Sequence, residues 1–158
     1  MRGERQAQPQ PELRLRALEP RDAAEVVRLA RRCAEAAVWS EETYARLGER
    51  GCQGWVAQTE TETLGFLVAR RAADEAEILN LAVAPESRHR GYATALAREA
   101  LREFRRQGVR RVFLEVRASN GGAIAFYKGL GFRAVGRRAA YYEMPQEDAI
   151  CMGLEFPA

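Results

Sequence analysis

The stretch LAVAPESRHRGYATALAREAL, residues 81–101, decides the fold of this chain of 158 residues. An apolar run ends at Pro85, a polar loop with two arginines and a histidine follows, and Gly91 precedes a long amphipathic segment. Apolar residues recur at helical spacing from Ala93 to Phe104, which predicts a helix with one continuous buried face. The stretch therefore predicts a strand, a loop and a helix that begins near Gly91.

The loop before this helix has the features of an anion-binding site. The first N–H groups of a helix lack intrahelical acceptors and carry partial positive charge, so together they bind phosphate. Gly91 has no Cβ to keep the backbone away from an anion, and Arg88 and Arg90 could add charge beside it. The R-x-x-G-x-A spacing differs from the G-x-x-x-x-G-K-S/T and G-x-G-x-x-G nucleotide motifs. The loop alone is equally compatible with a solvated helix start.

The rest of the sequence predicts further strands and helices around this stretch. Strands are expected at the alternating or β-rich runs, which are residues 12–18, 54–60, 62–71, 76–83, 110–117, 132–138 and 148–156. Helices are expected after the caps Asp22, Ser40, Gly91, and Ser119 or Asn120. A tyrosine-bearing loop is expected at residues 139–147. The order predicts an α+β fold, a single domain with a mixed central sheet of about seven strands flanked by about four helices.

Length and composition agree with one globular domain over residues 12–158. Hydrophobic residues make up 47% of the chain and charged residues 30%, and no apolar run approaches a membrane span. Residues 1–11 are rich in Gln, Pro and Arg and lack the apolar core of a signal peptide, which predicts a disordered lead-in. We therefore expect no membrane association.

Cysteine, histidine and charge patterns exclude several classes of site. Cys33, Cys52 and Cys151 form no C-x-x-C pair, so neither a disulfide framework nor a zinc site is expected, and a reduced cytoplasmic chain is the simplest interpretation. His89 is the only histidine and lies in the loop, which disfavours a Ser-His-Asp triad. The net charge of +3 comes from arginines spread along the chain, so we expect no nucleic-acid partner. Because the cysteines are scattered, we also expect no metal.

At residues 81–101 the sequence resembles the GNAT superfamily of acetyl-CoA-dependent N-acetyltransferases. Their central motif is a strand, a Q/R-x-x-G-x-G/A loop and a helix. The resemblance implies that the anion is the pyrophosphate of coenzyme A, and that one strand edge pairs with the pantetheine arm and polarises the acetyl carbonyl. The cofactor-binding residues that it implies are Leu81, Ala82, Val83, Arg88, His89, Arg90, Gly91, Tyr92, Ala93, Thr94 and Asn120.

The C-terminal half resembles a particular subfamily. FLEVRASNGGAIAFYKGLGF (residues 113–132) and RRAAYYEMPQEDAICM (residues 137–152) are similar to the RimI-type bacterial ribosomal-protein alanine N-acetyltransferases. The N-terminal half departs from that pattern, because the family's Pro-Trp-Ser reads Val38-Trp39-Ser40 here. The resemblance implies acetyl transfer to the N-terminal amine of a protein, with the alanine of a small-subunit ribosomal protein as the expected acceptor.

Glu115 and Tyr127 are the expected catalytic residues. Glu115 lies within the apolar run VFLEV, where burial of a carboxylate would raise its pKa toward that of a useful base. From the strand alone, Glu115 could instead face solvent or pair with Arg117. Tyr127 could serve as the acid for the departing thiolate or simply pack in the core. Asn120 could cap a helix, bind the cofactor, or do both.

Two other functions remain open from the sequence. One keeps the fold and changes the acceptor to a small amine or a lysine side chain. The other is a non-catalytic module that binds coenzyme A and serves a partner protein, against which the presence of both Glu115 and Tyr127 argues. Acidic residues could steer a basic peptide start toward the site, namely Glu41, Glu42, Glu143, Glu147 and Asp148.

Overall fold

The computed structural model describes residues 12–158, so the lead-in expected at residues 1–11 lies outside the described residues. Within the described part the predicted order of strands and helices is confirmed. The elements are β1 Arg14–Ala17, α1 Ala23–Arg31, α2 Glu41–Ala45, β2 Cys52–Gln58, β3 Thr63–Ala72, β4 Glu75–Val83, α3 Tyr92–Arg106, β5 Arg111–Arg117, α4 Gly121–Gly129, β6 Arg133–Tyr142 and β7 Glu147–Glu155. Short 3-10 turns at Pro20–Asp22, Leu47–Arg50 and Pro85–Ser87 connect some of them.

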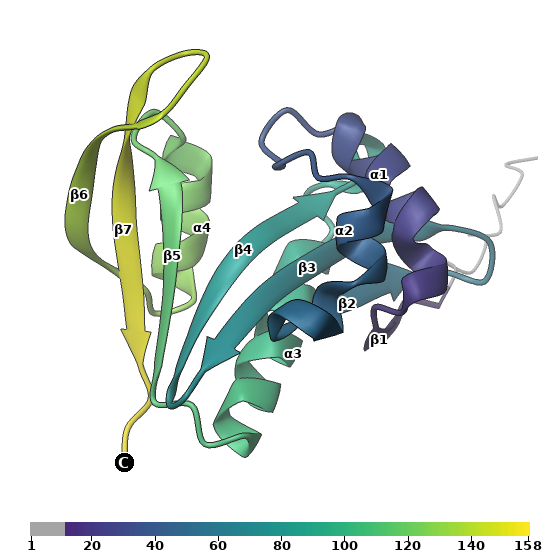
Figure 1. The fold of residues 1–158 in the computed structure, drawn as a ribbon, viewed down its shortest axis with the longest axis horizontal. Helices are drawn as coiled ribbons and strands as arrows, with labels where there is room; N and C mark the ends of the chain where they lie inside the picture. The colour runs from purple at the N-terminus through teal and green to yellow at the C-terminus, as the bar shows by residue number, and fades with distance from the viewer. Residues whose placement is uncertain (1–11) are drawn as a thin grey trace, which may run out of the picture.

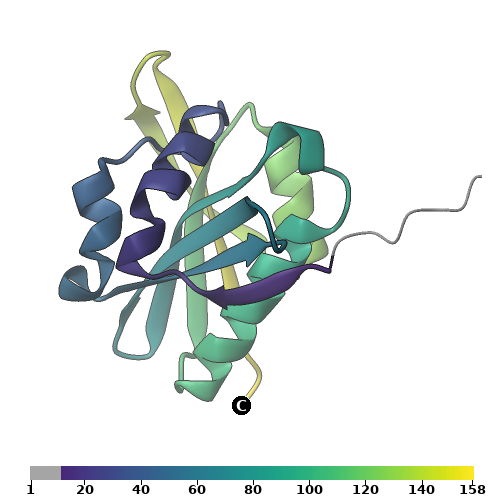
Figure 2. The same cartoon turned by 90° about the vertical axis from the view of Figure 1, so that its right-hand side faces the viewer.

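The strands form one mixed sheet in the order β1-β2-β3-β4-β5-β7-β6. Among residues 12–158 the pair β4 and β5 is parallel, and every other neighbouring pair is antiparallel. Figures 1 and 2 show α1 and α2 on one face of the sheet and α3 and α4 on the other. This arrangement confirms the predicted α+β class, because long crossover helices are needed only where strands run parallel.

Each face of the sheet has its own hydrophobic core. The apolar side of α3 packs with α4 against the sheet, and Leu96, Phe104 and Met152 are fully buried there. The amphipathic pattern that begins near Gly91 predicts this face of α3. On the opposite side, Val26 of α1 and Tyr44 of α2 pack against the sheet around Phe66. The two layers hold β2 to β5 rigidly between them.

The parallel pair β4 and β5 separates halfway along its length. The two strands pair only from Glu75–Ile78 with Arg111–Leu114, and beyond that point they diverge (Figure 1). In the pairing of β3 with β4, Val68 lies opposite Asn80 and Ala69 opposite Ile78, so Leu79 is an extra residue. Such a bulge bends the strand that carries it. The remaining edge of β4 is therefore open toward β5.

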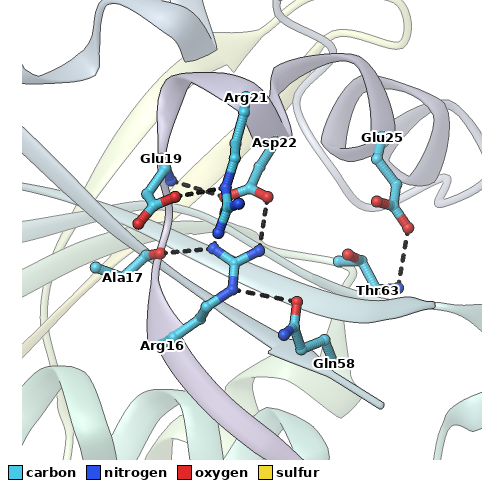
Figure 3. A network of polar contacts seen from close by, with 8 residues as sticks. All are labelled: Arg16, Ala17, Glu19, Arg21, Asp22, Glu25, Gln58 and Thr63. Carbon is cyan, nitrogen blue, oxygen red and sulfur yellow. Dashed lines mark hydrogen bonds and ion pairs between the residues drawn. The ribbon is translucent and has the colours of Figure 1, made fainter. Parts of the chain in front are cut away.

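The start of the chain is tied to the sheet by a buried ion pair. The Arg16 guanidinium donates to both Asp22 carboxylate oxygens, at 2.8 and 2.7 Å, and to the side chain of Gln58 (Figure 3). Asp22 also accepts the Glu19 N–H at 2.8 Å. Asp22 occupies the expected N-cap position of α1, but its side chain makes no cap hydrogen bond, because the carboxylate bonds residues before the helix.

Two more expectations concern local boundaries. Ser40 caps α2 as predicted, since its Oγ accepts the Thr43 N–H at 3.2 Å. The tyrosine-bearing loop is wrong in its bounds, because Tyr141 and Tyr142 belong to β6 and only residues 143–146 connect it to β7. Pairing with Glu147 of β7 holds Tyr142 in the sheet, and Tyr141 lies in the bulged segment directly before it. The bulge interrupts the alternation of side chains, so the sequence did not reveal this part of the strand.

The three cysteines are unpaired. Among residues 12–158 no helix is long and apolar enough to cross a membrane. Within the same residues no three acidic, histidine or cysteine side chains gather as metal ligands would.

Candidate active site

A cavity of about 310 Å³ lies where β4 and β5 separate. The two strands form its sides, α4 lies behind it, and residues 34–37 after α1 close another wall. Four residues expected in the site, from three different elements and the turn before α4, line it together: Leu81, Glu115, Asn120 and Tyr127. The opening of one strand pair therefore brings together residues that are far apart in the sequence.

The loop before α3 has the shape of an anion cradle. His89 and Gly91 both adopt left-handed backbone conformations, with φ of 60° and 83°. Alternation into left-handed residues turns backbone N–H groups toward a common concavity, and the first turn of α3 adds its own free N–H groups. A Cβ on Gly91 would meet no protein atom within 4 Å, so the space beside this residue is open. The backbone of residues 89–94 fits a phosphate group.

The open edge of β4 presents the amides of Leu81 and Val83. The Ala84 N–H bonds the Leu64 carbonyl of the β3 side at 2.7 Å. Successive residues of a strand direct their amides to opposite edges, so the Val83 and Leu81 N–H groups face the opening. Ala82 has the opposite orientation and its side chain is buried in the core under α1. Of the three predicted residues, Leu81 and Val83 are the ones placed to pair with a ligand.

Arg88 contacts both the end of β4 and the segment after α1. Its guanidinium donates to the Val83 carbonyl at 3.3 Å and forms an ion pair with Glu35 at 2.6 Å. Cys33 Sγ lies 3.5 Å from the same carbonyl. Arg88 therefore holds the end of β4 and the segment after α1, and its charge is already paired. Arg88 and Arg90 are both exposed at the loop, and the charge that either adds beside an anion stays a prediction.

Glu115 lies in a charged environment. Its side chain is 14% exposed, and Oε1 is 3.0 Å from Arg138 Nε on β6. The expected apolar surroundings are therefore wrong, because β6 brings a guanidinium that the sequence of β5 does not reveal. Pairing with Arg117 is wrong as well, since Arg117 pairs with Glu147 at 3.3 Å. The carboxylate beside the Tyr141 hydroxyl raises the pKa of Tyr141 to about 12.

Tyr127 both packs in the core and lines the cavity. The residue is only 8% exposed, and its ring contacts the rings of Phe126 and Phe132 edge to face at centroid distances of 5.0 and 5.5 Å. Burial raises the pKa of the Tyr127 phenol well above its ordinary value, because the phenolate would lose its hydration. The phenol is therefore protonated at neutral pH and can donate that proton.

Asn120 caps α4, one of its expected roles, and also faces the cavity. Its Oδ1 accepts the Ala123 N–H at 3.1 Å and so caps α4. The same residue lines the cavity. The cap fixes the direction of α4, and hence the position of Tyr127 two turns later.

Two residues of the cavity, Asn80 and Tyr142, were not expected there. Asn80 is buried on β4, donates to the Ala37 carbonyl at 2.9 Å and accepts the Ala37 N–H at 3.2 Å, so it fixes the wall after α1. In the sequence, Asn80 could have been recognised as a polar residue within an otherwise apolar strand. Tyr142 lines the cavity with the Arg117 guanidinium 4.4 Å from its ring centroid. Because Tyr142 was expected in a loop, its position in the cavity was not predicted.

The fold and the site define a coenzyme A-dependent acyltransferase. A split parallel strand pair, a carboxylate and a buried phenol meet at one cavity, and an anion cradle lies at the start of the helix that follows β4. The chain belongs to the acetyltransferase (GNAT) family, whose model matches residues 23–132.

Two bacterial N-acetyltransferases are similar to this chain in sequence. The ribosomal protein bS18-alanine N-acetyltransferase of Escherichia coli K12 is 39% identical over 124 residues, covering 77% of this chain and 83% of that protein. The N-alpha-acetyltransferase RimI of Mycobacterium tuberculosis is 42% identical over 78 residues, covering 49% of this chain and 48% of that protein.

Solved structures show the same fold. The crystal structure of the ribosomal-protein-S18-alanine N-acetyltransferase from Escherichia coli has a TM-score of 0.85 and 32% identity, covering 93% of this chain and 96% of that one. Arabidopsis thaliana NAA60 in complex with acetyl-CoA has a TM-score of 0.80 at 23% identity, covering 92% and 99%, and supports the fold alone.

Proposed function

We propose that this chain transfers the acetyl group of acetyl-CoA to the N-terminal amine of a protein, and that its acceptor is the N-terminal alanine of ribosomal protein bS18. One observation carries the proposal: Glu115 and Tyr127 line a single cavity at the open edge of β4. The name and coverage of the Escherichia coli relative support the choice of acceptor. Such an acceptor places the reaction in the cytoplasm.

Acetyl-CoA is the proposed co-substrate, and the chain offers groups along its whole length. The backbone of residues 89–94 would hold the pyrophosphate, with Arg90 beside it. The pantetheine arm would pair with the edge of β4 at Leu81 and Val83. Asn120, which already caps α4, would bind the arm from the opposite side. The thioester would then lie in the cavity where β4 and β5 separate.

The proposed reaction moves one proton at each end. Glu115 accepts a proton from the protonated amine, and the free amine attacks the thioester carbonyl. The Val83 N–H, which faces the opening, stabilises the negative charge that develops on the carbonyl oxygen. As the carbon–sulfur bond breaks, Tyr127 donates its proton to the departing thiolate. The attacking nitrogen releases its remaining extra proton to water, Tyr127 regains a proton from water and Glu115 gives up the one it accepted. The net products are the acetylated amine, free coenzyme A and one proton. An α-amine has a pKa of about 7.7–8.0, so little energy is needed to deprotonate it at neutral pH.

The acceptor is tested with two peptides of one sequence. The first has a free N-terminal alanine and no lysine, and the second is blocked at the N-terminus and has an internal lysine. We expect kcat/KM to be higher for the first, because a lysine amine with a pKa of about 10.4 is far more protonated at pH 7. Equal or reversed values would reject the N-terminal acceptor and favour a lysine or a small amine.

A second comparison tests the ribosomal acceptor. Peptides with the first residues of bS18 are compared with peptides in which only the alanine is replaced by a large residue such as leucine. Higher kcat/KM for the alanine peptide is expected. Indifference to the first residue would reject bS18 alanine as the specific acceptor and leave N-terminal transfer intact.

A further inference from the structure

The two acidic residues that open β7 lie on opposite faces of the sheet, and each contacts a different part of the active site. Adjacent residues of a strand point to opposite faces. Glu147 therefore lies on the face of Arg117, with which it pairs, and Asp148 lies on the face of Arg137. Neither carboxylate is free to attract a basic peptide, contrary to the expected steering role.

Asp148 holds a distorted segment of β6. Between Arg138 and Tyr142 the strand contains more residues than the facing part of β7, since these two residues lie opposite Ala149 and Glu147. Ala140, at the centre of this bulge, has a φ of 51°, a left-handed conformation that alanine disfavours. The Asp148 carboxylate accepts the Ala140 N–H at 2.8 Å and pairs with the Arg137 guanidinium at 2.7 Å. One side chain thus fixes both the start and the centre of the bulge.

The bulge carries the two β6 residues that face Glu115. Arg138 contacts the Glu115 carboxylate at 3.0 Å, and the Tyr141 hydroxyl lies beside the same carboxylate. The Arg138 guanidinium also lies 5.5 Å from the centroid of the Tyr141 ring. A change in the bulge would therefore move both neighbours of the proposed base together.

Glu147 holds the turn on the other side of the site. It accepts the Ser119 N–H at 2.6 Å, directly before the Asn120 cap of α4. Its other oxygen receives Arg117 at 3.3 Å. The contacts lower the pKa of both carboxyls, through Ser119 first for Glu147 and through the Ala140 N–H first for Asp148. Both are therefore charged at neutral pH.

We propose that Glu147 and Asp148 are positioning residues for acetyl transfer: Asp148 sets Arg138 and Tyr141 against the Glu115 carboxylate by holding the β6 bulge, and Glu147 sets Asn120 and Tyr127 by holding the turn before α4. The inference rests on the proposed function for its catalytic readout. Neither residue touches the substrates in this role. The two acids act through the end of β6 and the start of α4, shown in Figure 1, and Tyr142 and Asn120 from these two places line the cavity.

The two sides have different kinetic signatures. Asp148→Ala should lower kcat roughly 10- to 100-fold, the scale of a small misplacement of catalytic groups, and leave the affinity for acetyl-CoA unchanged. Glu147→Ala should lower kcat and also weaken acetyl-CoA binding, because Asn120 is part of the proposed cofactor contact. Asp148→Asn keeps an oxygen for the Ala140 N–H and should retain most of the activity.

A matched control separates positioning from general stability. Arg70 and Glu77 form a cross-strand pair at 3.0 Å with exposures of 53% and 36%, close to the 60% and 32% of Arg137 and Asp148. Glu77→Ala should leave kcat within about twofold of wild type, as expected for an exposed pair away from the chemistry. Similar losses of kcat in Glu77→Ala and Asp148→Ala would reject the proposal.

Ala140 provides the sharpest test. Glycine adopts a left-handed conformation without cost, so Ala140→Gly should restore several-fold of the kcat lost in Asp148→Ala. A wild-type kcat in folded Asp148→Ala, or an equal loss with and without Ala140→Gly, would overturn the role of Asp148. A wild-type kcat and acetyl-CoA affinity in Glu147→Ala would overturn the role of Glu147.

The failure of the proposed function would look different. If the wild-type chain acetylates neither peptide, the proposed acceptor is wrong. Hydrogen exchange then still tests the positioning roles of Glu147 and Asp148. Faster exchange confined to residues 137–142 in Asp148→Ala, and to residues 118–123 in Glu147→Ala, is expected. Unchanged exchange in these segments would overturn the positioning roles whatever the acceptor.

Discussion

Individual residues in the site are defined by their partners on other elements. Glu115 is a strand residue with a largely buried side chain, and its carboxylate lies beside Arg138 and Tyr141 of β6. The ion pair orients the carboxylate, which suits the proposed role of a group that accepts a proton from an ammonium. Tyr127 has the opposite environment, because burial among aromatic rings favours its neutral form. The two environments differ in the way expected for a pair in which one group is proposed to accept a proton and the other to donate one.

Replacing these two groups should lower turnover without removing the cofactor. Glu115→Gln should reduce kcat by about 10²–10⁴, the usual range for a general acid or base, and Tyr127→Phe should do the same while preserving the core volume. Acetyl-CoA affinity, measured by calorimetry, should change little, since the phosphate cradle lies in the loop after β4, outside the cavity that these two side chains line. Full kcat in either variant with a peptide acceptor would remove that residue from the mechanism.

Gly91 permits a clean test of the phosphate cradle. Gly91→Ala should weaken acetyl-CoA binding strongly, because the added Cβ enters only the space proposed for the pyrophosphate. Gly108 is the matched control: it lies just beyond the other end of α3, has a φ of 86° against 83° for Gly91, and its Cβ would also meet nothing within 4 Å. Both variants carry the same strain of about 1–2 kcal/mol, so only Gly91→Ala should change the affinity. Equal affinities by calorimetry would place the phosphate elsewhere.

At the level of elements, the site depends on where β4 changes direction. The bulge at Leu79 separates Ile78, which faces α3, from Asn80, which faces α1 and α2. Asn80 then bonds both backbone groups of Ala37 and the Tyr44 hydroxyl, so the wall after α1 is attached to β4 itself. Arg88 and Glu35 attach the same wall to the loop before α3. The loop before α3 and the wall after α1 are thereby linked.

Removing the Asn80 amide should loosen this wall. Asn80→Ala leaves the Ala37 backbone groups without their partner, which costs about 1–3 kcal/mol. For a chain of this size that lowers Tm by about 2–10 °C. Tyr44→Phe removes one of the three hydrogen bonds and should cost less. We also expect a higher KM for the peptide in Asn80→Ala, and an unchanged KM with wild-type Tm would show that the wall does not depend on this residue.

For the whole molecule, the buried pair of Arg16 and Asp22 joins β1 to the start of α1 (Figure 3). The Arg16 hydrogen bonds lower the pKa of Asp22, and burial opposes this only in part. An unfolded chain titrates such a carboxyl at its ordinary pKa of about 3.9. Because the folded pKa lies lower, the stabilisation is fully present above the unfolded pKa and is lost as pH falls through the folded pKa.

The stability of the molecule should therefore fall in acid partly through Asp22. Urea unfolding at several pH values should show the wild type losing stability below about pH 4. Asp22→Asn should be less stable at pH 7 and lose less on acidification, because the charged group is gone. Glu42→Gln, in an exposed pair with Arg46 at 3.5 Å, is the control and should leave the profile unchanged. A profile for Asp22→Asn parallel to that of the wild type would contradict this account.

The sequence by itself determined the parts of this protein whose causes are local. The order of elements, the caps Ser40 and Asn120, the helix that begins after Gly91 and the strand that carries Glu115 were all predictable. Each depends on residues within a few positions of one another, because helical periodicity, capping and strand alternation are short-range effects. The family resemblance in residues 81–101 and 113–152 depends on the same contiguous segments.

Only the tertiary structure decided which charged groups meet. Arg88 contacts Glu35 and the Val83 carbonyl, and Arg138 of β6 forms an ion pair with Glu115. Asp22 forms an ion pair with Arg16, so its side chain does not cap α1. These choices join residues that are distant in the sequence, with the exception of Arg16 and Asp22, which β1 and the turn after it fold together. A side chain's partner is fixed by the pairing register and by which face of the sheet it occupies, and one bulged residue reverses that face. The bulges at Leu79 and around Ala140 leave no periodic signal in the sequence, and they set the geometry of the site.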